Sequence, residues 1–149
     1  EKVSVGKKIS NLYIARMKSP HSLATKQVLL SSPDYDWERV DFWVNEGPAV
    51  IRRNGRICMT YSASATGAEY CMGWTKERLP VLVTDETAGL YGPGHNSFTV
   101  DENGRDIMVF HARQYDEITG DPLYDPNRHA YLACVEWEDG EMVFKPMRL

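Results

Sequence analysis

The stretch VNEGPAVIRRNGRICMTY, residues 44–61, decides the fold. Apolar residues at 49–51 and at 57–61 flank the dipeptide Asn54-Gly55. Asn-Gly between two apolar runs is the strongest short signal of a β-hairpin, because a type I′ turn needs positive φ at both central residues. The stretch therefore predicts two antiparallel strands joined by a tight turn.

The same signal recurs twice further along the chain. Apolar runs at 97–100 and 106–110 flank Asn103-Gly104, and runs at 131–135 and 142–144 flank Asp139-Gly140. Each set predicts another hairpin. Two further strand pairs alternate with the hairpins, and their predicted strands cover residues 12–17, 27–31, 69–73 and 79–83. No segment predicts a convincing helix, so the expected fold class is all-β.

The hairpins repeat at a spacing that is typical of a propeller. Gly55 and Gly104, the glycines of the first two turns, lie 49 residues apart. A period of about 40–50 residues with about four strands in each repeat is the signature of β-propeller blades. The strands add up to about two complete blades and parts of others, whereas a closed propeller usually has four or more. We therefore expect the chain to supply part of a propeller.

Composition and motifs argue against several classes of protein. The 149 residues carry a net charge of −4 and show no basic stripe, so we expect no nucleic-acid partner. No run of about 18 apolar residues is present, so we expect no membrane span. The three cysteines form no C-x-x-C pair, which argues against a disulfide framework or a zinc site. Walker, G-x-G-x-x-G and G-x-S-x-G motifs are absent, so we expect no organic cofactor.

The first eight residues give little information about localisation. They are polar and lack the apolar h-region of a signal peptide. This does not indicate a cytoplasmic protein. Localisation stays open, with a secreted or periplasmic protein slightly favoured over a cytoplasmic one.

Glu46 is the first candidate for chemistry. It lies in a Gly-Pro turn before the first hairpin, shortly after the aromatic pair Phe42 and Trp43. A carboxyl group beside apolar rings and a rigid turn can stay protonated near neutral pH. Glu46 is therefore a candidate general acid.

A second candidate segment covers residues 91–98. Two glycines and a proline bend the chain and deliver His95 and Asn96 to the start of a strand, where propeller blades face the central channel. His95 could be a metal ligand or a hydrogen-bonded core histidine, and the residues alone leave both readings open. His111 and Arg113 end the following strand, and either could face the channel or pack between blades.

A third candidate segment is the proline-anchored loop at 121–129. Such loops hold polar groups in fixed positions, which suits a binding site. Arg128 could direct its forked guanidinium group at sugar hydroxyls or at a carboxylate, or it could pair with the neighbouring Asp125.

In this order the segments resemble glycoside hydrolase family 43, and within it the α-L-arabinofuranosidase-like and β-xylosidase-like members. The resemblance runs from about residue 12 to residue 144 and matches the C-terminal half to two-thirds of the family domain. It implies a five-bladed β-propeller, of which residues 1–149 form a partial domain with roughly the last three blades. The strings that carry the resemblance are VNEGPAV (44–50), MTYSASAT (59–66), YGPGHNSFTV (91–100), VFHARQY (109–115) and DPLYDPNRHAY (121–131).

The resemblance also implies an activity, the inverting hydrolysis of arabinofuranosides or xylosides. In such a mechanism one carboxylic acid protonates the leaving oxygen, and a carboxylate roughly 6.5–9.5 Å away activates water. Glu46 in the Glu-Gly-Pro motif resembles the acid. The general base and an aspartate that tunes the acid belong to the first two blades of the family, and no aspartate in this chain matches their motifs.

Further roles follow from the same resemblance. His95 resembles a histidine near the propeller axis that holds a calcium or sodium ion, directly or through water. Arg128 resembles an arginine that contacts substrate hydroxyls, and Asn45, Asn96 and Tyr91 are expected to lie in or near the substrate site. The expected partners are an arabinose- or xylose-containing oligosaccharide and the missing propeller blades. The expected activity is release of terminal α-L-arabinofuranosyl residues, and the alternatives are a β-xylosidase, a non-catalytic carbohydrate-binding propeller and a structural or interaction propeller.

Overall fold

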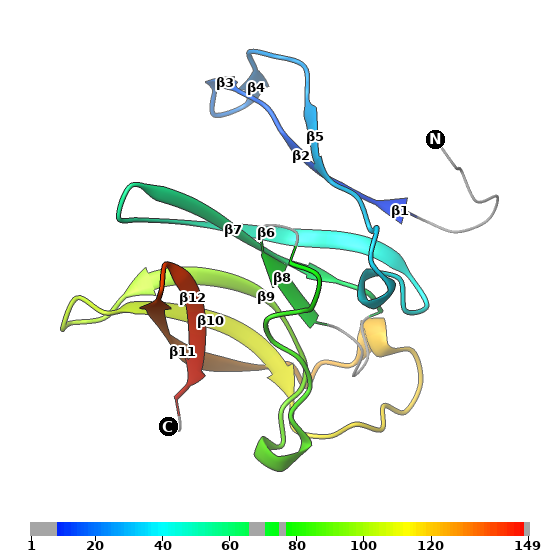
Figure 1. The fold of residues 1–149 in the computed structure, drawn as a ribbon. Coiled ribbons are helices and arrows are strands. Elements are labelled where there is room, and N and C mark those ends of the chain that lie inside the picture. Colours follow the sequence, from blue (N-terminus) through cyan, green and yellow to red (C-terminus); the bar gives the residue numbers. More distant parts are fainter. Residues whose placement is uncertain (1–8, 66–70, 75–76, 148–149) are drawn as a thin grey trace.

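Strands make up most of the structure, and they form two four-stranded sheets and two short hairpin pairs (Figure 1). The computed structural model describes residues 9–65, 71–74 and 77–147. The helices in this part of the chain are short 3-10 turns, and none is long and apolar enough to cross a membrane. The expected all-β class is confirmed. The elements are β1 (Ile9–Ser10), β2 (Leu12–Ile14), β3 (Met17–Ser19), β4 (Ser22–Leu23), β5 (Val28–Ser31), η1 (Asp36–Glu38), β6 (Trp43–Arg53), β7 (Arg56–Ala63), β8 (Cys71–Trp74), η2 (Glu86–Ala88), β9 (Tyr91–Val100), β10 (Asp106–Arg113), η3 (Pro122–Tyr124), β11 (His129–Glu138) and β12 (Glu141–Pro146).

One four-stranded sheet is a continuous meander. β9, β10, β11 and β12 pair antiparallel in chain order. β10 is nearly continuously buried, as a strand must be when both faces of its sheet are covered. The hairpins predicted at 97–110 and 131–144 are therefore confirmed.

The second four-stranded sheet has the order β1-β6-β7-β8. The hairpin predicted within 44–61 is confirmed as β6 and β7. β8 confirms the predicted strand at 69–73 in part, because residues 69–70 lie outside the described residues. The strand predicted at 79–83 is wrong, since Leu82 makes only an isolated bridge to Met72. Pro80 has no N–H for a ladder and so favours this short contact over a regular strand.

The three predicted hairpin turns have two different geometries. Positive φ at both central residues, as in a type I′ turn, occurs in the turns at Asn54-Gly55 and Asp139-Gly140. In the third turn only Gly104 has positive φ, and its N–H donates to the Asp101 carbonyl at 3.0 Å. The Asp101 carboxylate accepts from two further N–H groups of this turn. A side chain that satisfies turn donors therefore replaces the type I′ geometry there.

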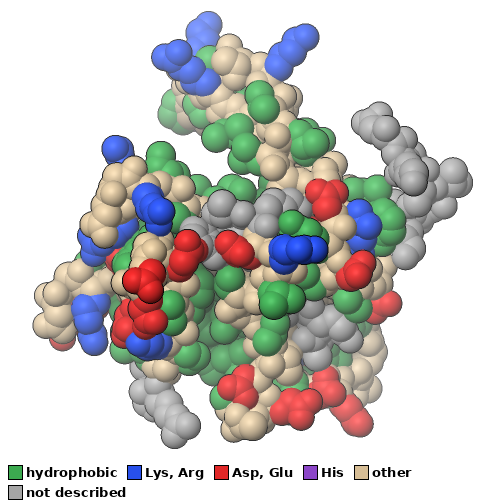
Figure 2. Space-filling model, in the orientation of Figure 1, with side chains coloured by type: hydrophobic (Ala, Val, Ile, Leu, Met, Phe, Trp, Pro, Cys, Tyr) green, Lys and Arg blue, Asp and Glu red, His purple; other side chains and the backbone are tan. Residues whose placement is uncertain are grey.

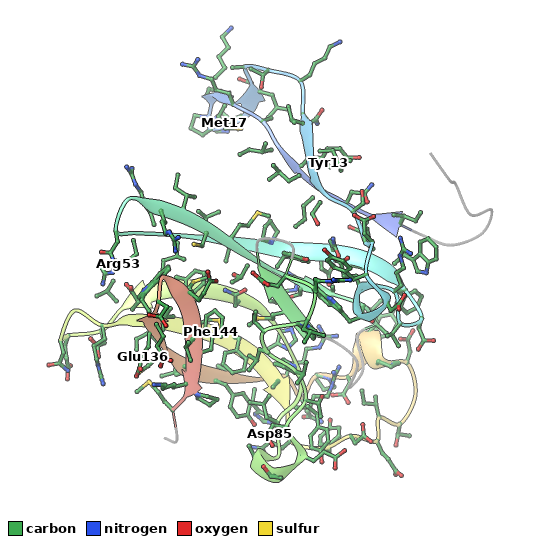
Figure 3. The ribbon with its side chains drawn as sticks, in the orientation of Figure 1. Tyr13, Met17, Arg53, Asp85, Glu136 and Phe144 are labelled. Carbon is green, nitrogen blue, oxygen red and sulfur yellow. The ribbon has the colours of Figure 1, made fainter. Side chains whose placement is uncertain are left out.

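Residues 12–31 form an arm that projects from the two sheets (Figures 1 and 3). β2 pairs with β5, as the sequence predicts, but β2 ends at Ile14 and the tip of the arm is a separate β3–β4 hairpin. Hydrophobic side chains lie exposed along the arm (Figure 2). They belong to Tyr13, Ile14, Met17, Leu23, Val28, Leu29 and Leu30.

The larger apolar core lies between the two four-stranded sheets. Its buried side chains come from both sheets, so this core joins the sheets face to face. A smaller cluster of Leu12, Tyr61 and Ala63 joins the base of the arm to β7. The members of the larger core are Ile51, Cys58, Met72, Leu90, Met108, Phe110, Ala112, Ala133, Val135 and Met142.

Polar contacts between hairpin turns join the sheets at the ends of β6 and β9. Arg53 Nε lies 2.8 Å from the buried Asp106 Oδ2, and Trp137 Nε1 donates to the same oxygen at 3.4 Å. Arg56 donates to the Gly140 carbonyl. We call these turn contacts the rim of the structure.

We expect Asp106→Asn to lower the free energy of unfolding by about 1–3 kcal/mol, because Arg53 loses a buried, charged acceptor. Glu136→Gln is the matched control, since it removes a carboxylate from an exposed pair with Lys145 and should cost less than about 1 kcal/mol (Figure 3). Urea denaturation of the full-length protein measures both values. Equal losses in the two variants would contradict the role of the buried pair.

Candidate active site

Two strands that pack against each other are irregular close to their starts. The β6–β7 pairing shifts between Glu46 and Ala49, where Gly47 has a φ of +56°. The β9–β10 pairing shifts on both sides of His111. β-Bulges redirect side chains and are over-represented next to active sites. His95, also in β9, has a φ of +49°, which is uncommon for a residue other than glycine.

Glu46 and His95 meet at these irregularities. Their closest polar atoms, Oε1 and Nδ1, lie 4.0 Å apart, and their side chains are 38% and 53% exposed. The imidazole lies against Gly47, where a Cβ would be 3.0 Å from Cδ2 of the ring. The His95 ring therefore lies against the backbone of β6, and both side chains are accessible on the surface of this chain. The role of His95 as a metal ligand or as a core histidine stays a prediction.

Ser62 connects the two strands, and sequence analysis did not single it out. Its hydroxyl accepts a hydrogen bond of 2.7 Å from the backbone N–H of His95. Ser62 is also the cross-strand partner of Glu46. One residue of β7 therefore fixes both halves of the Glu46–His95 pair. A serine in a strand carries no motif that would predict this role.

His111 lies next to His95, on the neighbouring strand β10. The two rings stack with centroids 6.2 Å apart and planes 19° from parallel. Burial lowers the pKa of His111 to about 4, and the positive charges of Arg128, His95 and Arg113 add to the effect. His111 is therefore neutral at neutral pH. The His111 ring therefore faces His95, an orientation that the sequence left open.

The pKa of His111 predicts a pH dependence of stability. Its folded-state pKa lies below the ordinary value of 6.5, so the unfolded chain binds the proton more readily. Stability should fall as the pH drops from about 6.5 and level off below about 4. We expect the loss of stability to be smaller in His111→Gln. The unfolding temperature of the full-length protein, measured from about pH 7.5 to about pH 4, checks this because the range includes the ordinary histidine pKa. His21→Gln, in the exposed turn of the arm, should keep the wild-type slope, and an unchanged slope in His111→Gln would contradict the prediction.

Two arginines flank the other side of His111. Arg113 is 2% exposed, and its Nη2 donates to the Pro122 carbonyl at 3.0 Å. Arg128 donates to the same carbonyl at 3.3 Å, and its Nε is buried without a hydrogen-bond partner among the described residues. The contact of Arg128 with substrate hydroxyls stays a prediction.

Sequence analysis gave Arg128 as one possible partner of Asp125, but the hydrogen bonds of Asp125 come from other residues. The backbone N–H of Asn127 and the Tyr115 hydroxyl donate to its carboxylate, and these bonds, with Arg113 and Arg128 nearby, lower its pKa. Arg113 Nε lies 3.7 Å from Asp125 Oδ2. Asp125 thus orders the loop that returns the chain to Arg128.

This loop lines an open pocket of about 540 Å³. It leaves β10 directly after Arg113 and returns to β11 directly after Arg128, so it lies at the same end of the sheet as His111. Tyrosine rings and hydrogen-bonding side chains line the pocket, a combination that suits a polyhydroxylated ligand. The lining residues are Tyr115, Glu117, Thr119, Asp121, Tyr124, Asp125, Pro126 and Asn127.

Two of the three other residues predicted for the substrate site, Asn45 and Asn96, are buried. Asn45 is fully buried, and its Nδ2 donates to Ser31 Oγ at 2.9 Å and to Glu38 Oε1 at 3.0 Å. Asn96 is 7% exposed and accepts from Thr60, while its Nδ2 is buried without a partner among the described residues. Asn45 therefore supports the strand of Glu46, and its direct contact with substrate stays a prediction.

Tyr91 is the third of these residues. It is half-buried at the start of β9, and its cross-strand partner is Arg113. This position lies at the same end of the sheet as His95, but the described contacts do not join Tyr91 to Glu46. Its contact with substrate likewise stays a prediction.

In the part of the chain that the structure describes, the donors around His95 are too few for a calcium centre. Among the described residues no group of three or more His, Cys, Asp or Glu side chains could hold a metal ion. Calcium takes six to eight oxygen ligands, whereas His95 offers one ring nitrogen. The ion near His95 stays a prediction.

The sequence profile of glycosyl hydrolases family 43 matches residues 2–142, nearly the whole chain. The chain belongs to this family. A solved structure, an α-L-arabinofuranosidase from Lactobacillus brevis, superposes with a TM-score of 0.84 and is 48% identical over 91% of this chain and 46% of its own. The fold is therefore that of the matching part of that structure.

Two curated relatives are similar in sequence. An extracellular exo-α-(1→5)-L-arabinofuranosidase from Streptomyces avermitilis is 47% identical, over 86% of this chain and 30% of the relative. The α-L-arabinofuranosidase 43 from Humicola insolens is 46% identical, over 87% of this chain and 30% of the relative. The chain therefore spans about a third of the length of these relatives.

Proposed function

We propose that this chain is part of an inverting glycoside hydrolase that removes terminal α-L-arabinofuranosyl residues from plant-type polysaccharides or oligosaccharides. The observation that carries the proposal is the half-exposed carboxyl group of Glu46, held at a bulge 4.0 Å from His95. A general acid must be fixed in position and within hydrogen-bond reach of the leaving oxygen. The names of the similar arabinofuranosidases support this substrate class, and one of them supports an extracellular location.

In the proposed mechanism Glu46 gives its proton to the glycosidic oxygen as the bond from that oxygen to the anomeric carbon breaks. Water attacks the opposite face of the sugar and passes a proton to a carboxylate roughly 6.5–9.5 Å from the acid. We place this carboxylate outside the described residues, because the chain spans about a third of its curated relatives. Arg128 is partly exposed and would donate to sugar hydroxyls through its guanidinium group, whereas Asn96 is 7% exposed and is expected to lie behind the sugar site.

We also propose that the two sheets and the arm belong to a five-bladed propeller, in which this chain supplies about three blades. The exposed apolar side chains of the arm support this arrangement. Tyr13 and Ile14 are each 55% exposed and Val28 is 61% exposed, although they belong to paired strands. Further propeller strands would cover them.

The test is hydrolysis by the full-length protein. We expect arabinose to be released from phenyl α-L-arabinofuranoside and from arabino-oligosaccharides, and proton NMR at early times should show the β-anomer first, because inversion is proposed. Faster release of xylose from phenyl β-xyloside would favour a β-xylosidase instead. Binding of the oligosaccharide by calorimetry without any product would favour a non-catalytic carbohydrate-binding propeller.

A further inference from the structure

A fully buried carboxylate, Glu38, lies against the strands of the candidate active site. Its Oε2 accepts hydrogen bonds from the backbone N–H groups of Asp34 and Tyr35, at 2.7 and 2.8 Å. Its Oε1 accepts from Asn45 Nδ2 at 3.0 Å and from the Tyr61 hydroxyl at 2.9 Å. Each of these four groups donates, which matches an ionised carboxylate because that form only accepts.

The two side chains on Oε1 lie next to the general-acid candidate along both strands. Asn45 directly precedes Glu46 in β6, and Tyr61 directly precedes Ser62 in β7. Glu46 and Ser62 are themselves cross-strand partners. One oxygen atom of Glu38 therefore ties together the two strands at the position of Glu46.

The bulge makes this tie important. Regular pairing of β6 with β7 resumes only at Ala49, so the long ladder on the turn side does not fix Glu46. On the other side of the bulge the ladder consists of two residue pairs, Asn45 with Ala63 and Glu46 with Ser62, and the hydrogen bond from the Ser64 N–H to the Val44 carbonyl. This short ladder gains from Glu38, because charge-assisted hydrogen bonds are about twice as strong as neutral ones.

We propose that Glu38 is a positioning residue for Glu46, which holds β6 and β7 in the register that aims the acid at the leaving oxygen. The proposal rests on the proposed function. Glu38 does not touch the substrate, because its side chain is completely buried. Its effect reaches the reaction through Asn45, Tyr61 and the backbone of both strands.

Glu38→Gln tests the proposal in the full-length protein. Glutamine keeps the size of the side chain, but its NH₂ group would face two N–H or O–H donors. We expect kcat/KM for phenyl α-L-arabinofuranoside to fall by about 100-fold, the loss that a misplacement of about 1 Å can cause. A dinitrophenyl leaving group needs little protonation, so the same variant should hydrolyse the dinitrophenyl substrate at nearly the wild-type rate.

Two further variants keep the test clear of folding effects. Tyr61→Phe removes one of the four donors and should show the same substrate dependence to a smaller extent. Asp85→Asn removes a carboxylate that caps another 3-10 helix, η2, and should leave both rates unchanged (Figure 3). Circular dichroism and thermal unfolding report whether each variant is folded, and Tyr61→Phe carries the test if Glu38→Gln does not fold.

The comparison of substrates decides the outcome. An equal loss on both substrates in folded Glu38→Gln, or in Tyr61→Phe in its place, would show a structural role only and overturn the proposal. Unchanged rates on both would also overturn it. Wild-type protein that hydrolyses neither arabinofuranoside would instead refute the proposed function, which distinguishes the two failures.

Discussion

Replacement of Glu46 by glutamine is expected to lower kcat/KM for phenyl α-L-arabinofuranoside by about 10²- to 10⁴-fold, the range that a general acid contributes. Glutamine keeps the shape of the side chain but has no proton to give to the leaving oxygen. The substitution replaces the half-exposed carboxyl group beside His95 with an amide of the same size. Initial rates of the full-length protein over a range of substrate concentrations give kcat/KM.

The leaving group separates proton donation from other roles of Glu46. The dinitrophenyl substrate should lose little in the Glu46→Gln variant, because its leaving group departs without a proton. Glu136→Gln, at an exposed glutamate of β11, should hydrolyse both substrates like the wild type. If the phenyl substrate reacts at the wild-type rate in Glu46→Gln, Glu46 is not the acid. A similar loss on both substrates would give it a role other than proton donation.

Gly47→Ala is expected to have the second large effect, on both stability and activity. At a φ of +56° a residue with a Cβ costs about 1–2 kcal/mol. The new Cβ would also lie 3.0 Å from His95 Cδ2, so the ring must move away. Because the ring lies beside the Glu46 carboxyl group, we expect kcat/KM to fall by about 100-fold. Urea denaturation and initial rates measure the two effects.

Gly89→Ala is the matched control for this substitution. Gly89 has a φ of +62°, and nothing lies within 4 Å of the position that its Cβ would occupy. This variant should therefore show the backbone cost without the loss of activity. If Gly47→Ala and Gly89→Ala are equally active, the contact between Gly47 and the His95 ring does not matter for the reaction.

Local signals in the sequence were sufficient to predict the hairpins. Asn-Gly and Asp-Gly between apolar runs placed all three long hairpins correctly, because the turn chemistry acts within a few residues. The strand predicted at 79–83 was wrong because its apolar composition hid the effect of Pro80 on the ladder. The separate hairpin at the tip of the arm was also missed, since short strands such as β3 and β4 leave almost no periodic pattern.

The candidate site was predictable only where a motif marks it. Glu46 and His95 lie in glycine- and proline-rich segments, and the structure brings them together. Glu38 and Ser62 carry no such mark, because a glutamate is usually exposed and a serine fits most positions. Their roles depend on contacts between residues that are distant in sequence, namely the Ser62–His95 and Glu38–Tyr61 hydrogen bonds, whose partners are 33 and 23 positions apart. Such contacts follow from the pairing of strands and cannot be read from neighbours in the chain.

The bulge after Glu46 has a consequence for how the protein can change over time. It interrupts the ladder between the rim, where Arg53 and Asp106 join the turns, and the end of the strand that carries the acid. Separate sets of residue pairs therefore fix the rim and the register at Glu46. A substitution at the rim can change the heat tolerance of the protein without moving its acid, whereas a substitution beside Glu46 changes both.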